Sequence, residues 1–206
     1  MTKEEKANTI THLIPVIIIL PMIVPFIIHS IDAGWTFIVT TCLFLAGMLN
    51  MFLASTCYHA APIGSQLKKN LRVWDHSSIY VMIAGCYSPL CAVFGGALGI
   101  TMISIMWAFA LMGIIGKIVA LGKYPTLSLI LYLMMGWMAL IVLYWMWTDL
   151  PHLAFWLIVL EGVFYTIGAY FFANDEKHAF YHAIWHVFII LGAATHTYVV
   201  AVLLSA

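Results

Sequence analysis

Seven long apolar segments dominate this sequence, and short segments rich in polar residues, glycine or proline separate them. The apolar segments cover residues 10–28, 35–60, 74–94, 98–121, 126–147, 153–173 and 180–204. Each has the ~20 residues that a helix rising ~1.5 Å per residue needs to cross a hydrocarbon core of ~30 Å. The pattern predicts an all-α membrane protein, a seven-transmembrane helix bundle that forms one domain over residues 1–206.

The composition supports a chain that lies in a lipid bilayer. Hydrophobic residues make up 65% of the sequence and charged residues 8%, far from the usual balance of a soluble domain. Alternating polar and apolar positions typical of membrane strands are absent, so helices are the expected spans. The net charge is zero, which gives no indication of nucleic-acid binding. The four cysteines lie in apolar segments without paired spacing, so neither disulfides nor a cysteine-based zinc site is expected.

The basic residues predict the orientation of the helices. All eight occupy the N-terminus, every second connection between the apolar segments or, for Lys117, the last turn of the segment before such a connection: Lys3, Lys6, Lys68, Lys69, Arg72, Lys117, Lys123 and Lys177. The alternate connections contain no lysine or arginine. Cytoplasmic loops of membrane proteins carry an excess of these residues. We therefore expect a multi-pass protein of the cell membrane with a cytoplasmic N-terminus, an external C-terminus and an odd number of spans.

Polar side chains gather near the cytoplasmic ends of three segments. Ser55 and His59 lie four residues apart, as do His182 and His186, so each pair shares a helix face. Asp75 follows at the predicted start of the third segment. The second segment is predicted to run toward the cytoplasm, and the third and seventh to run away from it, so all five side chains are expected at a similar depth.

Three imidazoles and one open position form a ligand set that zinc uses in catalytic sites. We therefore predict that His59, His182 and His186 bind Zn²⁺, and that Asp75 and Ser55 act beside it. Asp75 would accept a proton from water, offset the charge of the ion or orient an imidazole, whereas Ser55 would donate to an oxyanion or to the substrate. The alternative is that the histidines only pack and hydrogen-bond between helices. The roles of Glu161 and His196, at greater bilayer depth, stay open.

Several motifs together resemble the hemolysin III family, the bacterial branch of the progestin and adipoQ receptors. The motifs are Ser55-Thr-Cys-Tyr-His59, Asp75-His-Ser-Ser-Ile-Tyr80, His182-Ala-Ile-Trp-His186, and Glu5, Asn8 and His12 before the first segment. The resemblance covers nearly the whole chain. It implies a seven-helix bundle with a cytoplasmic N-terminus and zinc held by His59, His182 and His186. It also implies a place among membrane hydrolases that include alkaline ceramidases.

Three functions remain open at this stage. The first is a zinc-dependent hydrolase that acts on a lipid amide or ester, with a membrane lipid as substrate. The second is a non-enzymatic regulator of membrane homeostasis in which zinc is structural, for which four protein ligands are expected. The third is a pore-forming cytolysin, which requires a polar path through the bundle.

Overall fold

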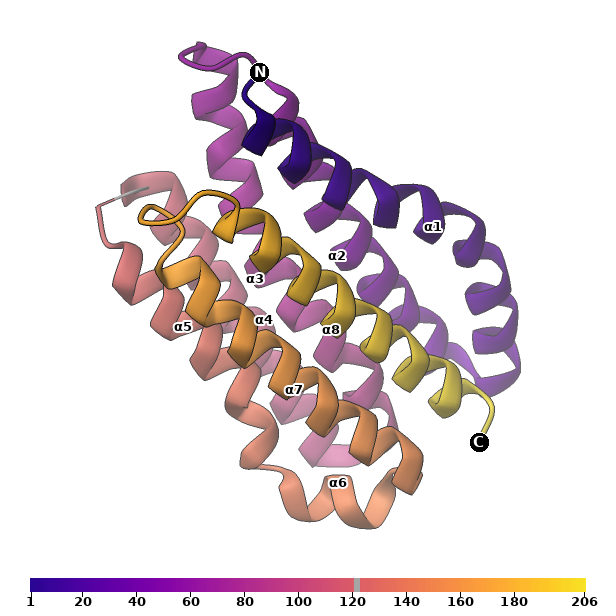
Figure 1. Cartoon of the computed structure of the whole chain (residues 1–206). Coiled ribbons are helices and arrows are strands. Elements are labelled where there is room, and N and C mark those ends of the chain that lie inside the picture. The colour runs from indigo at the N-terminus through magenta and orange to yellow at the C-terminus, as the bar shows by residue number, and fades with distance from the viewer. Residues whose placement is uncertain (121–122) are drawn as a thin grey trace.

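The computed structural model describes residues 1–120 and 123–206, and within these residues the chain is helical without strands. The helices are α1 (Lys3–Ala33), α2 (Trp35–Ala60), α3 (Gln66–Phe94), α4 (Gly96–Ala120), α5 (Pro125–Trp137), the 3₁₀ helix η1 (Met138–Leu140), α6 (Leu143–Asp149), α7 (His152–Ala173) and α8 (Tyr181–Leu204). They form a bundle in which α8 lies beside α1 and α7 (Figure 1).

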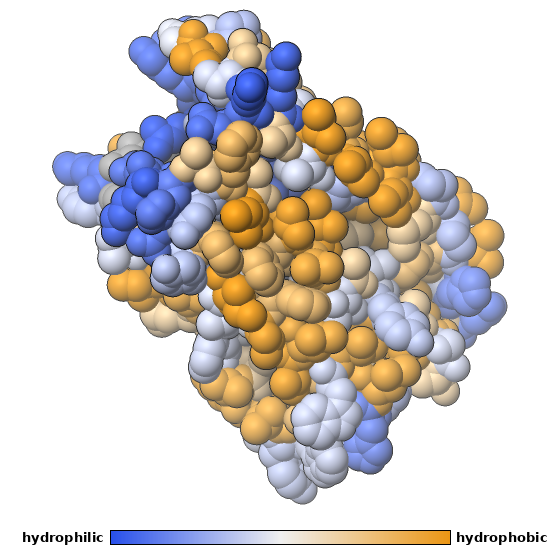
Figure 2. Space-filling view, viewed as in Figure 1, coloured by the Kyte–Doolittle hydropathy of each residue, from blue (hydrophilic) through white to orange (hydrophobic). Residues whose placement is uncertain are grey.

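Six helices in this part of the chain are long and apolar enough to cross a bilayer, and α5 with η1 and α6 makes a seventh if this bent segment is one span. The two termini lie at opposite ends of the bundle (Figure 1). Hydrophilic residues gather at the end that holds the N-terminus and the connection before α8, and hydrophobic residues cover the middle (Figure 2). The all-α multi-pass membrane architecture predicted from the sequence is confirmed.

Most helices extend beyond their apolar segments. The prediction for the second span, residues 35–60, agrees with α2, but α3 begins at Gln66 rather than Trp74. Ser65 caps this helix by accepting a hydrogen bond from the backbone N–H of Lys68 at 3.0 Å, so the helix begins in a polar segment that hydropathy does not detect. Asp75 therefore lies in the third turn of α3, not at its start. The predicted end of the fourth span, Leu121, lies outside the described residues.

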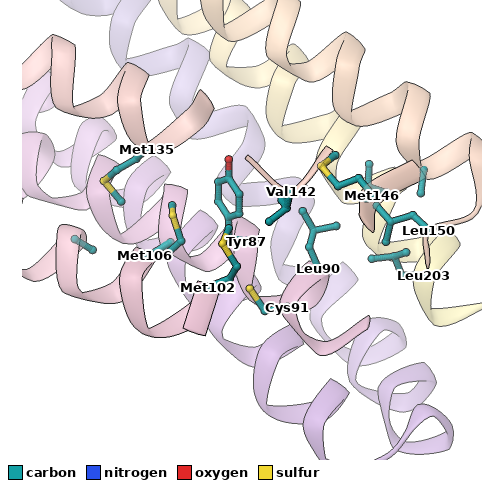
Figure 3. Close-up of a cluster of buried hydrophobic side chains, with 14 of the residues drawn as sticks. Tyr87, Leu90, Cys91, Met102, Met106, Met135, Val142, Met146, Leu150 and Leu203 are labelled. Carbon is teal, nitrogen blue, oxygen red and sulfur yellow. The ribbon is translucent and has the colours of Figure 1, made fainter. Parts of the chain in front are cut away.

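The fifth predicted span, residues 126–147, is not one straight helix. It bends by 49° between its two parts, and the Tyr87 side chain from α3 binds the backbone at the break. The Tyr87 hydroxyl donates to the Gly136 carbonyl at 2.6 Å and accepts from the Ala139 N–H at 2.8 Å. A break at bilayer depth is tolerated when protein groups satisfy the freed backbone. Figure 3 shows Tyr87 in the buried cluster beside Val142 and Leu90.

Glycines bring α2 and α3 close together. A Cβ added at Gly47 would lie 3.0 Å from the Val81 carbonyl oxygen, and one at Gly85 would lie 2.9 Å from that of Leu43. Small residues at such crossings allow the backbones of membrane helices to approach. The contact fixes α2, which carries His59, against α3, which carries Asp75.

The first helix is continuous although it contains Pro15, Pro21 and Pro25. It curves around the outside of the bundle (Figure 1), as expected where proline removes hydrogen bonds from a helix. Its N-terminal part contacts α2 through Glu5 and α8 through Thr11. The residues of this part reach the polar cluster described next.

Candidate metal centre

The three predicted metal ligands converge as the sequence indicates. One ring nitrogen from each of His59, His182 and His186 lies within 4.8 Å of the corresponding atoms of the other two. The ring centroids of His59 and His182 lie 5.1 Å apart, and those of His182 and His186 lie 4.7 Å apart. Zn–N bonds measure ~2.0–2.1 Å, so small side-chain shifts bring all three nitrogens to one ion. The cluster can bind a metal.

Glu5 of α1 orients the His59 ring. The Nδ1 atom of His59 donates to Oε2 of Glu5 at 2.7 Å, and the ammonium of Lys68 lies 3.0 Å from Oε1 of the same carboxylate. Lys68 also donates to the Tyr58 carbonyl at 2.8 Å. Since Nδ1 carries the proton, Nε2 of His59 presents its lone pair to the cluster. That Nε2 atom is buried without a hydrogen-bond partner, as expected of a ligand nitrogen.

The other two histidines have equivalent supports. Asp175 Oδ2 accepts from Nδ1 of His182 at 2.6 Å. The hydroxyl of Thr11 lies 3.0 Å from Nδ1 of His186 and donates its own proton to the Ala7 carbonyl at 2.9 Å, so it accepts from the imidazole. Each ring therefore directs Nε2 into the cluster. Such partners fix the tautomer of a metal-binding histidine and raise its basicity.

The connection before α8 places Asp175 close to His182. Phe180, the residue before α8, has a φ of 64°, a left-handed conformation that costs a non-glycine residue of the order of 1 kcal/mol. This conformation turns the chain from the Asn174–Phe180 connection into α8, so that the first turn of the helix carries His182 back toward Asp175. Sites that tolerate such strain are often functional.

Ser55 and Asp75 lie in the same place as the three imidazoles. Together with His12, His182 and His186 they line a cavity of about 40 Å³. Ser55 is 2% exposed and Asp75 9% exposed, and the hydroxyl lies next to the carboxylate. A site of this size accommodates an ion with a water molecule. Three neutral nitrogen ligands, a buried nitrogen without a partner and a nearby carboxylate fit a metal such as zinc.

The sequence indicated only some of the groups that hydrogen-bond to the three imidazoles. One role suggested for Asp75 was to orient an imidazole. In the structure, Glu5, Thr11 and Asp175 orient the three imidazoles. Glu5 belongs to a motif of the resemblance, but no spacing rule links it to His59. Thr11 and Asp175 carried no signal in the sequence, since a threonine in a helix and an aspartate in a loop are common.

His12 is a fourth histidine at this centre, and the sequence gave it no role. Its ring stacks on that of His186, with centroids 3.5 Å apart and planes at 15°. It is 3% exposed, and both its ring nitrogens are buried without a partner. The metal cluster found among the described residues does not include it. His12 therefore lines the cavity and fixes the plane of the His186 ring.

Two further polar residues, His76 and His196, are not among the three converging imidazoles. His76 follows Asp75 and lines the same cavity, and its backbone carbonyl accepts from the Tyr132 hydroxyl at 2.8 Å. His196 binds Glu161 rather than the cluster, with Nδ1 2.7 Å from Oε2. Glu161, whose role the sequence left open, therefore has a definite partner at bilayer depth.

The sequence matches known proteins along nearly its full length. The family model "Haemolysin-III related" matches residues 1–197. A protein of Bacillus subtilis (strain 168), "Hemolysin-3 homolog", is 40% identical over 195 residues, covering 93% of this chain and 90% of that protein. "Hemolysin-3" of Bacillus cereus is 36% identical over 194 residues, covering 93% and 88%.

A human protein, "Monocyte to macrophage differentiation factor", is also similar. It is 32% identical over 208 residues, covering 96% of this chain and 83% of the human protein. The matches agree with the family resemblance carried by the histidine motifs. The chain belongs to the haemolysin-III related family of membrane proteins.

Proposed function

We propose that the protein is a zinc-dependent membrane hydrolase that cleaves an amide or ester bond of a lipid. The observation that carries the proposal is the composition of one site: three imidazoles have converging nitrogens, and two of them line a cavity with a buried carboxylate and a hydroxyl. A structural zinc site has four protein ligands, whereas a catalytic site has three and keeps one position for water or substrate. The three-histidine cluster favours the catalytic type over the structural zinc of a regulator.

Zinc in such a site supplies Lewis acidity toward a carbonyl oxygen and toward water. The residues of this chain supply the remaining functions. Asp75 accepts the proton of the attacking water and passes it to the leaving amine or alcohol. Ser55 donates a hydrogen bond to the oxygen that becomes negatively charged. Glu5, Thr11 and Asp175 hold the imidazoles in the tautomer that binds metal.

A lipid is the expected substrate because of where the cavity lies. Besides the polar groups, apolar and aromatic side chains form its walls, including Met51, Phe172 and Trp185. The surrounding helices are long and apolar enough to cross a bilayer. A lipid with its headgroup near the basic end of the bundle would place its amide or ester bond near the depth of the three histidines.

The test separates metal binding from catalysis. Wild type, Asp75→Asn and His186→Ala are purified in detergent and loaded with zinc, and each is assayed on ceramides, other N-acyl lipids and phospholipid esters. We expect hydrolysis by wild type only, stoichiometric zinc in wild type and Asp75→Asn, and reduced zinc in His186→Ala. Bound zinc without hydrolysis of any lipid would contradict the proposal and favour the regulator.

A further inference from the structure

Lys117 is a buried lysine that forms no ion pair with the described part of the chain. It lies in the last turn of α4 and is 6% exposed. Among the described residues, the lysine ammonium groups that donate a hydrogen bond or form an ion pair are those of Lys68 and Lys177. The Lys117 ammonium instead lies 5.6 Å from the centroid of the Tyr132 ring. Lysines are almost never fully buried unless they are paired, so this position points to an anionic ligand.

The packing of α3 on α4 places Lys117 level with His76. The Tyr80 ring of α3 lies against Gly113 of α4, where an added Cβ would be 2.4 Å from the ring. A connection of one residue joins the two helices, and they pack together, so they run antiparallel. His76 precedes Tyr80 by four residues, and Lys117 follows Gly113 by four. Both therefore lie one turn nearer the basic end of the bundle.

Arg72 adds a second cation to this region. It precedes His76 by four residues on α3, and its side chain is exposed. The charges of Lys117 and Arg72 are close enough to act on the His76 ring, whose Nδ1 atom is buried without a hydrogen-bond partner. The carboxylate near Lys117 is that of Asp75, which lies beside Ser55. One carboxylate leaves one positive charge of the two cations without compensation.

A phosphate group matches Arg72, His76 and Lys117, which we call the basic cluster. Ammonium and guanidinium groups only donate hydrogen bonds, and an imidazole N–H donates as well. Phosphate oxygens accept such bonds and carry the opposite charge. Basic pockets between membrane helices on the cytoplasmic side bind phosphorylated lipid headgroups. Because His76 and Asp75 line the same cavity, a phosphate at His76 would lie beside the carboxylate of the proposed active site.

We propose that the basic cluster binds the phosphate of a lipid headgroup and thereby selects phosphorylated lipids for the neighbouring site. The inference rests on the proposed function and names its substrate class, lipids whose phosphate is on the carbon next to the acylated oxygen or nitrogen. Lys117 and Arg72 offset the charge of the phosphate, and the imidazole N–H of His76 donates to one of its oxygens. The amide or ester bond then lies near Asp75 and Ser55.

The experiment compares ether lipids with and without a phosphate, since these contain no bond that the site could hydrolyse. Calorimetry on the zinc-loaded protein in uncharged detergent gives dissociation constants for dioleyl glycerol phosphate, dioleyl glycerol and inorganic phosphate. We expect the phosphate lipid to bind about tenfold more tightly than dioleyl glycerol, the factor that one charge-assisted hydrogen bond contributes. Inorganic phosphate should bind much more weakly than the phosphate lipid, because it buries no apolar surface.

Variants assign the preference for the phosphate lipid to the basic cluster. Lys117→Met removes the buried charge and keeps an unbranched apolar side chain, so it should fold, bind zinc and lose the preference. Arg72→Gln changes an exposed side chain and should reduce the preference, which tests the cluster even if Lys117→Met does not fold. Lys69→Met makes the same change at an exposed lysine of α3 and should behave as wild type.

Three results would each overturn the inference. They are no preference in the wild type, an undiminished preference in the folded Lys117→Met or in Arg72→Gln, and inorganic phosphate that binds as tightly as the phosphate lipid. The last result would assign the basic cluster to a soluble phosphate instead of a lipid.

The binding assay does not depend on turnover. A protein that prefers the phosphate lipid through Lys117 but hydrolyses no lipid would refute the proposed function and support the phosphate site. A protein that hydrolyses neutral and phosphorylated lipids equally well would do the reverse.

Discussion

Glu5 and His59 are 54 residues apart in the sequence, and their side chains meet through a hydrogen bond of 2.7 Å. The contact joins the first turn of α1 to the last turn of α2 at the candidate metal cluster. Thr11 makes the equivalent contact with His186 at 3.0 Å. The N-terminal part of α1 contributes no residue to the three-histidine cluster, yet it holds two of its imidazoles.

Removal of the Glu5 carboxylate should weaken metal binding without removing a ligand. Partners of metal-binding histidines typically contribute about 10- to 100-fold to affinity, so Glu5→Ala should raise the dissociation constant for zinc by this factor. The measurement is a competition titration against a chromophoric chelator. Glu4→Ala changes the exposed neighbouring carboxylate and should leave the affinity unchanged. Equal affinities for the two variants would show that Glu5 does not support the site.

Metal removal should lower the thermal stability of the protein. A ligand that binds only the folded state stabilises it by about 2.7 kcal/mol at a concentration 100 times its dissociation constant. A chelator should therefore lower the midpoint of thermal unfolding of the wild type in detergent. His186→Ala, which lacks one ligand, should show little response to the chelator. A midpoint that does not change in the wild type would argue against metal in the cluster.

The Tyr87 hydroxyl should stabilise the break between α5 and α6. Tyr87→Phe leaves the Gly136 carbonyl and the Ala139 N–H without their partner, and an unsatisfied buried group costs about 1–3 kcal/mol. We expect a lower free energy of unfolding, measured by denaturant titration in detergent micelles. Tyr144→Phe makes the same change at a residue that is 71% exposed and should have little effect. Equal stability of the two variants would contradict the role given to Tyr87.

Two glycines one turn apart on α4 offer a matched test of helix packing. A Cβ at Gly113 would lie 2.4 Å from the Tyr80 ring, whereas one at Gly116 would have no atom within 4 Å. Gly113→Ala should destabilise the bundle by about 1–3 kcal/mol through overpacking. Gly116→Ala should be neutral or stabilising by up to about 1 kcal/mol, because alanine favours helices. Thermal unfolding in detergent measures both, and a stable Gly113→Ala would show that Tyr80 moves aside.

The hydropathy of the sequence located the spans because only long apolar helices satisfy their backbone in a bilayer. It did not locate all helix ends. Gln66 and the basic residues after it are too polar for a span, yet they extend α3 because Ser65 caps the helix outside the apolar segment. The sequence also did not predict the break in the fifth span. Residues 126–147 contain no charged residue and no proline, and the hydroxyl that stabilises the break comes from Tyr87, about 50 residues earlier.

The sequence by itself determined the all-α membrane architecture and the set of histidines that meet, because hydropathy and helical spacing are local properties of the chain. Spacing of four residues placed His182 and His186 on one face of α8, and span direction placed His59 at the same depth. Only the tertiary structure decided which groups hold the imidazoles and that His196 binds Glu161. These contacts join residues far apart in the chain, and they depend on how the helices rotate and pack against one another.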